Sequence, residues 1–185
     1  MTTLILDGFL GWHSRWEGLR RRVEREVGSC RIWRYDTSGL VSLEKISARL
    51  AGELRELDTD FHLVGYSMGG IVIREALRQA PDLRLKKTVL LHSPHAGTHM
   101  AHLLPLPAAR EMRPGSAFLR RLDEVEWSRP TLASWCAGDL MIVPGSSACW
   151  SRASHILRSP VPAHAWPIYS PAIHQSVVRF LNDNA

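Results

Sequence analysis

Short apolar runs alternate with longer amphipathic stretches along this chain. The short runs predict buried strands over Thr3–Asp7, Cys30–Tyr35, Phe61–Val64, Lys87–His92, Leu132–Cys136 and Ala165–Tyr169. Runs of this length between turn residues are typical of buried strands and too short for buried helices. The amphipathic stretches repeat apolar residues at intervals of three or four. They predict helices over Ser14–Val27, Val41–Leu57, the stretch that ends near Gln79, Ser116–Leu122 and His174–Leu181.

Strands that alternate with helices of this length predict parallel β-α units, with helices on both faces of the sheet. The chain has 185 residues, about the length of one domain, and no repeat or linker interrupts it. We therefore expect a single α/β domain over residues 1–185, built on a compact, doubly wound and mostly parallel sheet. Pro94, Pro105, Pro107 and Pro114 interrupt the stretch 93–127. Because so few residues lie outside the predicted core elements, we expect no large cap domain.

Composition narrows the classes of function. Hydrophobic residues make up 45% and charged residues 22%, as in ordinary soluble proteins, and no apolar run is long enough to span a bilayer. The net charge is +5, and much of the excess lies on the first predicted helix. There, arginines alternate with Glu17, Glu24 and Glu26, which is typical of a solvated helix face. We expect no nucleic-acid partner and no transmembrane segment.

The three cysteines, Cys30, Cys136 and Cys149, lack the spacing of metal ligands. An odd number of cysteines favours free, buried thiols in a reducing compartment, with a Cys136–Cys149 disulfide as the alternative. The N-terminal residues lead directly into a predicted strand and do not resemble a signal peptide. We expect a cytoplasmic protein without metal or organic cofactor, and a secreted form whose signal has been removed stays an alternative.

The stretch DFHLVGYSMGGIVIREALRQA, residues 60–80, carries the main chemical signal. It reads as strand, G-x-S-x-G turn and helix, which is the sequence form of a nucleophile elbow. A strained turn lifts the serine Oγ clear of the backbone, and the glycines let strand and helix pass close together. The N-terminus of the helix points N–H groups at the place where an oxyanion would form. The pattern predicts Ser67 as a nucleophile.

A serine nucleophile on such a sheet is followed in the chain by an acid and then by a histidine. Asp139 follows the predicted strand Leu132–Cys136, where a carboxylate can accept the imidazole Nδ1–H. The competing acid is Asp123, whose setting RRLDEVE is typical of a charged helix surface. We predict Asp139 as the acid.

Three histidines lie downstream of Asp139. His174 follows the predicted last strand and opens the last helix, which is where this fold would place the base. His164 precedes that predicted strand, and His155 lies in a long, loop-rich connection. We predict His174 as the base.

The backbone donors for an oxyanion would be the N–H of Met68, directly after the nucleophile, and one N–H from the loop Asp7–Gly11 (DGFLG). In that loop we choose the N–H of Phe9. The side chains of Phe9, Leu10, Trp12 and Met68 would make an apolar acyl pocket, with Leu10 and Trp12 in contact with the substrate. The stretch Leu103–Pro107 could border the entrance as a small flap, or be a packed loop.

The chain resembles the small lipases and carboxylesterases of the α/β-hydrolase superfamily. The resemblance rests on DGFLG, GYSMGG, HSPHAGT, RPGSAFLRRL and GDLMIVP, which together extend from the first strand to the acid, and on His174. GYSMGG and GDLMIVP are widespread among serine hydrolases, whereas SPHAGT followed by RPGSAFLRRL is similar to lipases that act on acylglycerols. The resemblance implies Ser67, Asp139 and His174 as the catalytic triad and Phe9 and Met68 as oxyanion donors.

One residue departs from that family, because Asp7 stands where a histidine usually precedes the first glycine of the oxyanion loop. A carboxylate there would oppose the developing negative charge unless Asp7 is paired, with Arg15 and His95 as candidate partners.

These features predict an enzyme, a serine esterase or lipase that cleaves a small-molecule ester or lipid through an acyl-enzyme on Ser67. A thioesterase, amidase or acyltransferase with the same triad is the first alternative. A non-catalytic binding protein on a hydrolase scaffold is the second.

Overall fold

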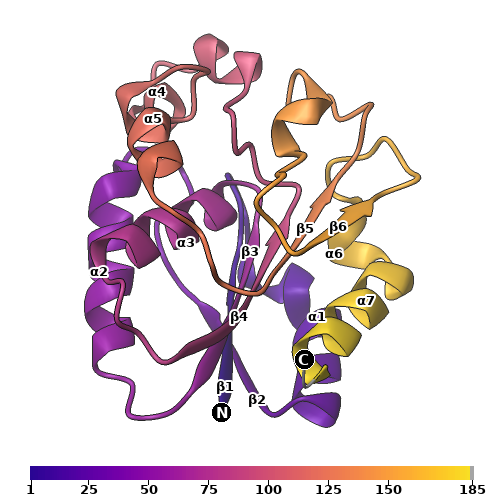
Figure 1. Cartoon of the computed structure of the whole chain (residues 1–185). Helices are drawn as coiled ribbons and strands as arrows, with labels where there is room; N and C mark the ends of the chain where they lie inside the picture. The colour runs from indigo at the N-terminus through magenta and orange to yellow at the C-terminus, as the bar shows by residue number, and fades with distance from the viewer. Residues whose placement is uncertain (184–185) are drawn as a thin grey trace.

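The computed structural model describes residues 1–183, and its centre is one six-stranded sheet of order β2-β1-β3-β4-β5-β6. All neighbouring strands run parallel. The strands are β1 (Thr2–Leu6), β2 (Ser29–Trp33), β3 (Phe61–Tyr66), β4 (Leu85–Leu91), β5 (Thr131–Trp135) and β6 (His155–Arg158). The order reverses direction beside β1, so the sheet is doubly wound and has helices on both faces (Figure 1).

Two apolar layers cover the sheet, and the alternation of side chains along β1 divides them. Leu4 and Leu6 face a core built with helices α2 (Leu43–Arg55) and α3 (Met68–Gln79). Ile5, between them, faces a second core with helices α1 (Glu17–Glu26) and α7 (Pro171–Asn182). Successive strand residues point to opposite faces, so a strand buried on both sides is apolar throughout. This explains why the apolar runs predicted these strands.

The remaining elements are short and belong to the connections between strands or, for the last of them, to the segment after β6. They are the 3-10 turns His13–Trp16, His99–Leu103 and Gly145–Ala148 and the helices α4 (Pro107–Glu111), α5 (Ala117–Glu124) and α6 (Trp166–Tyr169). The predicted helix Ser14–Val27 is thus a 3-10 turn followed by α1. No large cap covers the sheet edge within residues 1–183, and no helix in that range is long and apolar enough to cross a membrane.

The prediction of the last strand is wrong. The stretch Ala165–Tyr169 forms α6, and the sixth strand is β6, about ten residues earlier. Pro167 has no N–H for a strand ladder, but proline is accommodated in the first turn of a helix. β6 escaped notice because it is an edge strand of four residues whose side chains are mostly exposed, so it carries no apolar run.

The cysteines are free thiols, without a disulfide in the described part of the chain. Cys30 and Cys136 are buried as expected, whereas Cys149 is exposed. The alternative Cys136–Cys149 disulfide is therefore not formed.

Candidate active site

Ser67 stands between β3 and α3 on a strained turn. Its φ of 52° and ψ of −121° lie outside the regions that side chains ordinarily adopt. The Ser67 N–H donates to the carbonyl of Leu91 at 2.8 Å, which ties the turn to the end of β4. The surrounding structure thus holds a backbone conformation that an isolated serine would leave, and the strain lifts Oγ out of the turn.

Two glycines make this turn possible. A Cβ added at Gly65 would lie 2.6 Å from the Cα of Gly70, so strand and helix could not approach as closely as they do. A Cβ at Gly70 would lie 2.0 Å from the Oγ of Ser93, in the loop after β4. Gly65 therefore serves the close approach that the G-x-S-x-G pattern predicted, and Gly70, directly after the pattern, serves the contact with the loop after β4.

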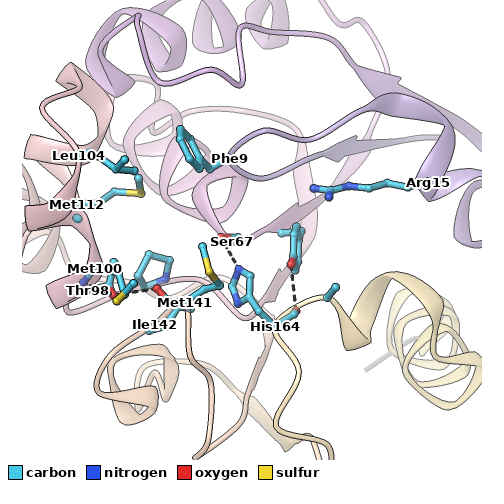
Figure 2. Close-up of a pocket in the computed structure, with 15 residues that line it drawn as sticks. Phe9, Arg15, Ser67, Thr98, Met100, Leu104, Met112, Met141, Ile142 and His164 are labelled. Atoms are coloured by element: carbon cyan, nitrogen blue, oxygen red, sulfur yellow. Dashed lines mark hydrogen bonds between the residues drawn. The ribbon is translucent and has the colours of Figure 1, made fainter.

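His164 lies against Ser67 (Figure 2). Its Nε2 is 2.9 Å from Ser67 Oγ, and its Nδ1 is 2.7 Å from Asp139 Oδ2. An ionised carboxylate only accepts hydrogen bonds, so Nδ1 carries the proton donated to Asp139, and Nε2 is left free to accept from the serine hydroxyl. Ser67, His164 and Asp139 thus form a continuous chain of hydrogen bonds.

Asp139 is held in place from both sides of its carboxylate. Oδ1 accepts the N–H groups of Met141 at 2.8 Å and Ile142 at 3.0 Å, while Oδ2 faces His164. Burial opposes ionisation of Asp139, but the hydrogen bond from His164 and the nearby His92 outweigh it. The pKa of the Asp139 carboxyl therefore lies below its ordinary value, and the group is charged at neutral pH.

His174 does not reach this site. It is buried on α7, near Gly18 of α1, and its Nε2 donates to the carbonyl of Ile168 at 3.0 Å. Burial lowers its pKa, so the ring is neutral and structural. The prediction that His174 would face Ser67 is wrong, and His164 occupies that place.

Asp123 and His155, the alternative acid and an alternative base, have other partners in the structure. Asp123, the competing acid, pairs with Arg74 at 2.8 Å. His155 belongs to β6, where its ring meets Phe180 edge-on with centroids 5.3 Å apart. Neither side chain has a hydrogen bond to Ser67 in the part of the chain that the structure describes.

The loop that carries His164 is tied to the strand that carries the nucleophile. The hydroxyl of Tyr66, next to Ser67, donates to the carbonyl of His164 at 3.0 Å. The two rings also pack, with centroids 5.1 Å apart. His164 is thus anchored to β3 although it follows β6 in the chain.

Asp7, the departure from the family pattern, is paired with Arg15. The guanidinium Nε donates to both carboxylate oxygens, at 3.0 and 2.8 Å, and the N–H of Gly8 donates to Oδ1 at 2.7 Å. His95, the other candidate, instead stacks on Trp150 with centroids 4.7 Å apart. The charge of Asp7 is therefore compensated at the start of the oxyanion loop.

Of the two expected oxyanion donors, Met68 follows Ser67 in the chain, and Phe9 lies beside the same cavity. Met68 is the first residue of α3, so its N–H has no partner within the helix. Phe9 lines the same cavity as Ser67, and its N–H makes no backbone hydrogen bond within residues 1–183. A role as oxyanion donors stays a prediction for both.

A cavity of about 260 Å³ opens beside Ser67 and His164. Its walls are mostly apolar (Figure 2). They come from the loop after β1, the 3-10 turn His99–Leu103, α4 and the segment around Asp139. Phe9, Met100, Leu104, Met112, Met141 and Ile142 contribute side chains. Arg15 is at its edge, already engaged by Asp7.

Leu10 and Trp12, expected in the acyl pocket, do not line this cavity. Their side chains are 63% and 56% exposed. Of the stretch Leu103–Pro107, Leu104 lines the cavity, whereas Leu106 packs against the core and Leu103 is exposed. The stretch therefore borders the cavity and is also partly packed.

Comparison with solved structures places this architecture among the α/β-hydrolases. No family model and no curated protein sequence matches the chain. The chain is similar to a structure reported for LipS and LipT, two metagenome-derived lipolytic enzymes (TM-score 0.75, 15% identity, 97% of this chain and 92% of that one). It is also similar to the Paleococcus ferrophilus monoacylglycerol lipase (TM-score 0.73, 16% identity, 97% and 93%).

The phospholipase PlaB from Legionella pneumophila is a longer protein (TM-score 0.62, 16% identity). The match covers 73% of this chain and only 39% of PlaB. At such identities the likeness establishes the fold. The chain has the α/β-hydrolase fold, without a large cap, as the sequence predicted.

Proposed function

We propose that this protein is a serine hydrolase that cleaves carboxylic esters through an acyl-enzyme on Ser67. The observation that carries the proposal is the unbroken relay from Ser67 Oγ through His164 to Asp139, with contacts of 2.9 and 2.7 Å. Three buried or half-buried groups of the right types, in the right order, on a strained elbow, are the requirements of nucleophilic acyl transfer.

Each residue then has a defined role. His164 Nε2 takes the proton of Ser67 Oγ during attack on the ester carbonyl and returns it to the leaving alcohol. Asp139 keeps the proton on Nδ1 and stabilises the imidazolium that forms. The tetrahedral oxyanion would be held by the N–H groups of Phe9 and Met68, the second assisted by the N-terminus of α3. Water then repeats the sequence and releases the acid.

The Asp7–Arg15 pair supports this chemistry. An unpaired carboxylate at the start of the oxyanion loop would oppose the charge that develops on the substrate. Because Arg15 binds both carboxylate oxygens and Gly8 N–H binds one, the pair is neutral and also holds the loop. Asp7 is therefore compatible with catalysis.

The cavity favours an apolar acyl group. Its volume of about 260 Å³ and its methionine and leucine walls suit a hydrocarbon chain of modest length. The structurally similar lipolytic enzymes and monoacylglycerol lipase have names that agree with an ester or lipid substrate. A thioester would meet the same atoms, so a thioesterase or acyltransferase activity is tested with the corresponding thioester. The assembled relay opposes a purely binding role.

A p-nitrophenyl ester series from acetate to palmitate, with a fluorophosphonate label, tests the proposal. Wild-type protein should hydrolyse the esters and take the label at Ser67, and Ser67→Ala should lose both. The matched control is Ser151→Ala, at an exposed serine outside the cavity, which should keep both. Absence of turnover and of label in folded wild-type protein would overturn the proposal.

The acid is tested separately with Asp139→Asn. The amide keeps the shape but does not hold the proton on Nδ1, so kcat should fall by about 10⁴-fold. Asp123→Asn is the matched control, because Asp123 is the other acid that the sequence offered, and its kcat should be close to wild type. Equal losses in both variants would contradict the assignment of Asp139.

A further inference from the structure

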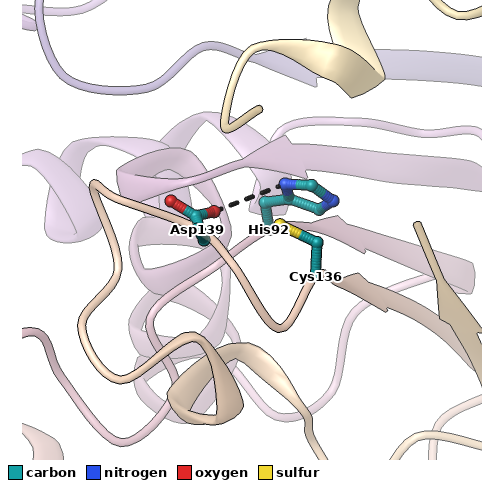
Figure 3. Close-up of side chains that lie close together, drawn as sticks. All are labelled: His92, Cys136 and Asp139. Atoms are coloured by element: carbon teal, nitrogen blue, oxygen red, sulfur yellow. Dashed lines mark ion pairs between the residues drawn. The ribbon is translucent and has the colours of Figure 1, made fainter. Parts of the chain in front are cut away.

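Next to the relay, three potential metal ligands meet at Asp139 (Figure 3). His92 follows β4, and Cys136 and Asp139 follow β5. One ligand atom of each lies within 4.8 Å of the others, and all three side chains are buried. The cysteine spacing along the sequence gave no sign of this cluster, because the histidine comes from a different strand.

His92, like His62 on β3, is a buried histidine whose ring has no hydrogen-bond partner among the described residues, and it alone of the two lies beside other potential metal ligands. It is 0% exposed, and neither ring nitrogen has a hydrogen-bond partner within residues 1–183. Its backbone also has a φ of 44°, in the left-handed region that few non-glycine residues adopt. A buried polar group without a partner costs about 1–3 kcal/mol, so an orphaned imidazole on a strained backbone indicates a ligand.

The distances fit a metal ion better than a hydrogen bond. His92 Nδ1 and Asp139 Oδ2 are 3.5 Å apart, too long for a good hydrogen bond. In a tetrahedral site with metal–ligand bonds of about 2.1 Å, two ligand atoms are separated by about 3.4 Å. The Cys136 sulfur, within 4.8 Å of both, needs a shift of at most about 1 Å to complete a third corner.

The charges also balance. A thiolate from Cys136, the carboxylate of Asp139 and a neutral His92 together carry two negative charges, which a divalent ion neutralises in the protein interior. One sulfur, one imidazole nitrogen and one carboxylate oxygen form a ligand set suited to zinc and cobalt and unsuited to magnesium or calcium. Binding releases the thiol proton to solvent.

A hollow in the protein borders the cluster at Cys136. This hollow of about 400 Å³ lies next to β6 and is lined by Cys136, Gly138 and Pro162 among others. It is separate from the cavity beside Ser67, because the two share no lining residue. An ion could therefore reach Cys136 without passing through the substrate cavity.

We propose that His92, Cys136 and Asp139 form a site for a zinc-like divalent ion that inhibits the enzyme by sharing the carboxylate of Asp139. The inhibitory part rests on the proposed function. Asp139 Oδ2 has a lone pair for His164 and a second for the ion, so the ion shares the carboxylate that must stabilise the imidazolium. Its positive charge opposes imidazolium formation, which slows attack by Ser67 without blocking the cavity.

Binding is tested with Co²⁺ on chelator-treated, reduced protein. Wild-type protein should show a thiolate-to-cobalt charge-transfer band in the near ultraviolet that Zn²⁺ displaces. Cys136→Ala should lose the band, while Cys30→Ala, at the other buried thiol, and Cys149→Ala, at the exposed thiol, should keep it. A missing band in wild-type protein, or an unchanged band in Cys136→Ala, would overturn the site.

Inhibition is measured in the same samples against the metal-free rate of each variant. The Zn²⁺ concentration for half inhibition should rise by about 10- to 100-fold in Cys136→Ala. His92→Asn is the second variant, since asparagine tolerates positive φ and keeps the backbone, and it should lose inhibition similarly. Equal zinc sensitivity in all variants would overturn the inhibitory role.

The two proposals fail in different ways. A cobalt band in a protein that neither turns over esters nor labels at Ser67 would overturn the proposed hydrolase and leave the metal site standing. Ester turnover that depends on Ser67 without any cobalt band would do the reverse.

Discussion

The two halves of the sheet hold their site residues by different means. β1, β3 and β4 form a packed interior, and every residue of β3 is buried. β5 and β6 lie at one edge of the sheet, and the residues of β6 are exposed or half-buried. The first half is covered by long helices, whereas the connection from β5 to β6 contains only one 3-10 turn between loops (Figure 1).

The difference determines how precisely each half positions its chemistry. Ser67 is fixed by packing, because strand, helix and the loop after β4 meet at distances that leave no room for a side chain at Gly65 or Gly70. Asp139 and His164 lie on loops and are fixed by hydrogen bonds instead, to Met141 and Ile142 for the acid and to Tyr66 for the base. A packed half thus presents Ser67, and a hydrogen-bonded half presents Asp139 and His164, the groups that we propose activate it.

The largest expected effect separates the two histidines. His164→Ala removes the base and should lower kcat by about 10⁴-fold or more, as losses of a triad member do. His174→Ala removes a structural hydrogen bond to Ile168 and should mainly lower stability. Steady-state kinetics with p-nitrophenyl butyrate, alongside thermal unfolding, measures both. A large loss of kcat in well-folded His174→Ala, with His164→Ala active, would reverse the assignment.

The packed half should tolerate no added atom at the elbow. Gly65→Ala would place a Cβ 2.6 Å from Gly70 and should reduce the free energy of unfolding by about 3 kcal/mol or more. Gly52→Ala is the matched control, because nothing lies within 4 Å of a Cβ there on α2. It should stabilise the helix by about 0.5–1 kcal/mol. Denaturant unfolding gives both values, and equal effects would contradict the tight contact.

The packed half should also make stability sensitive to acid. Burial lowers the pKa of His62, on β3, from 6.5 to about 4. The unfolded chain then binds the proton more readily, so this stability is complete above pH 6.5 and is lost as the pH falls toward 4. Between pH 8 and pH 5 the loss should be about 2 kcal/mol.

Denaturant unfolding at several pH values checks this. His62→Leu should flatten the dependence, because a leucine keeps the apolar burial and has no proton to gain. His155→Gln, at an exposed histidine of β6, is the control and should leave the slope unchanged. A slope that survives in His62→Leu would show that other groups cause it.

The smallest effect tests the link between the halves. Tyr66→Phe keeps the ring beside His164 but loses the hydroxyl that donates to its carbonyl. A hydrogen bond of this kind is worth about 1 kcal/mol, so kcat should fall by about fivefold with KM little changed. Tyr169→Phe, at an exposed tyrosine, is the control and should leave kcat unchanged. A change confined to KM would contradict a positioning role.

The packed half was predictable from sequence, and the edge was not. Buried strands and amphipathic helices leave periodic patterns, so β1, β3, β4, α2 and α3 and the elbow at Ser67 followed directly from the residues. Asp139 followed because β5, although near the edge, is still buried and recognisable.

The edge strand β6 leaves no such pattern, so the sequence did not predict it. The missing strand changed which histidine was predicted as the base. The rule used was that the base follows the last strand. With Ala165–Tyr169 taken as that strand, the rule selected His174, whereas His164 is the first histidine after β6. The misplaced strand came from β6, whose exposed side chains leave it without an apolar signature.

Pairings in space were also beyond the sequence. Arg15 and His95 were equal candidates to neutralise Asp7, and only the fold shows that His95 is enclosed beside Trp150 and Arg74. The meeting of His92 with Cys136 and Asp139 depends on the adjacency of β4 and β5, which no local pattern encodes.

The Tyr66 hydroxyl has a consequence for how this protein can change over generations. The hydroxyl of Tyr66, the residue before Ser67, holds His164 directly by a hydrogen bond. The edge of the sheet between them is therefore not the only structure that fixes the position of His164 relative to Ser67. The exposed side chains of β6, at His155, Ile156 and Arg158, can then be exchanged while the relay keeps its geometry. We expect descendants and engineered variants to differ most in this edge, and to keep a hydroxyl-bearing ring at position 66.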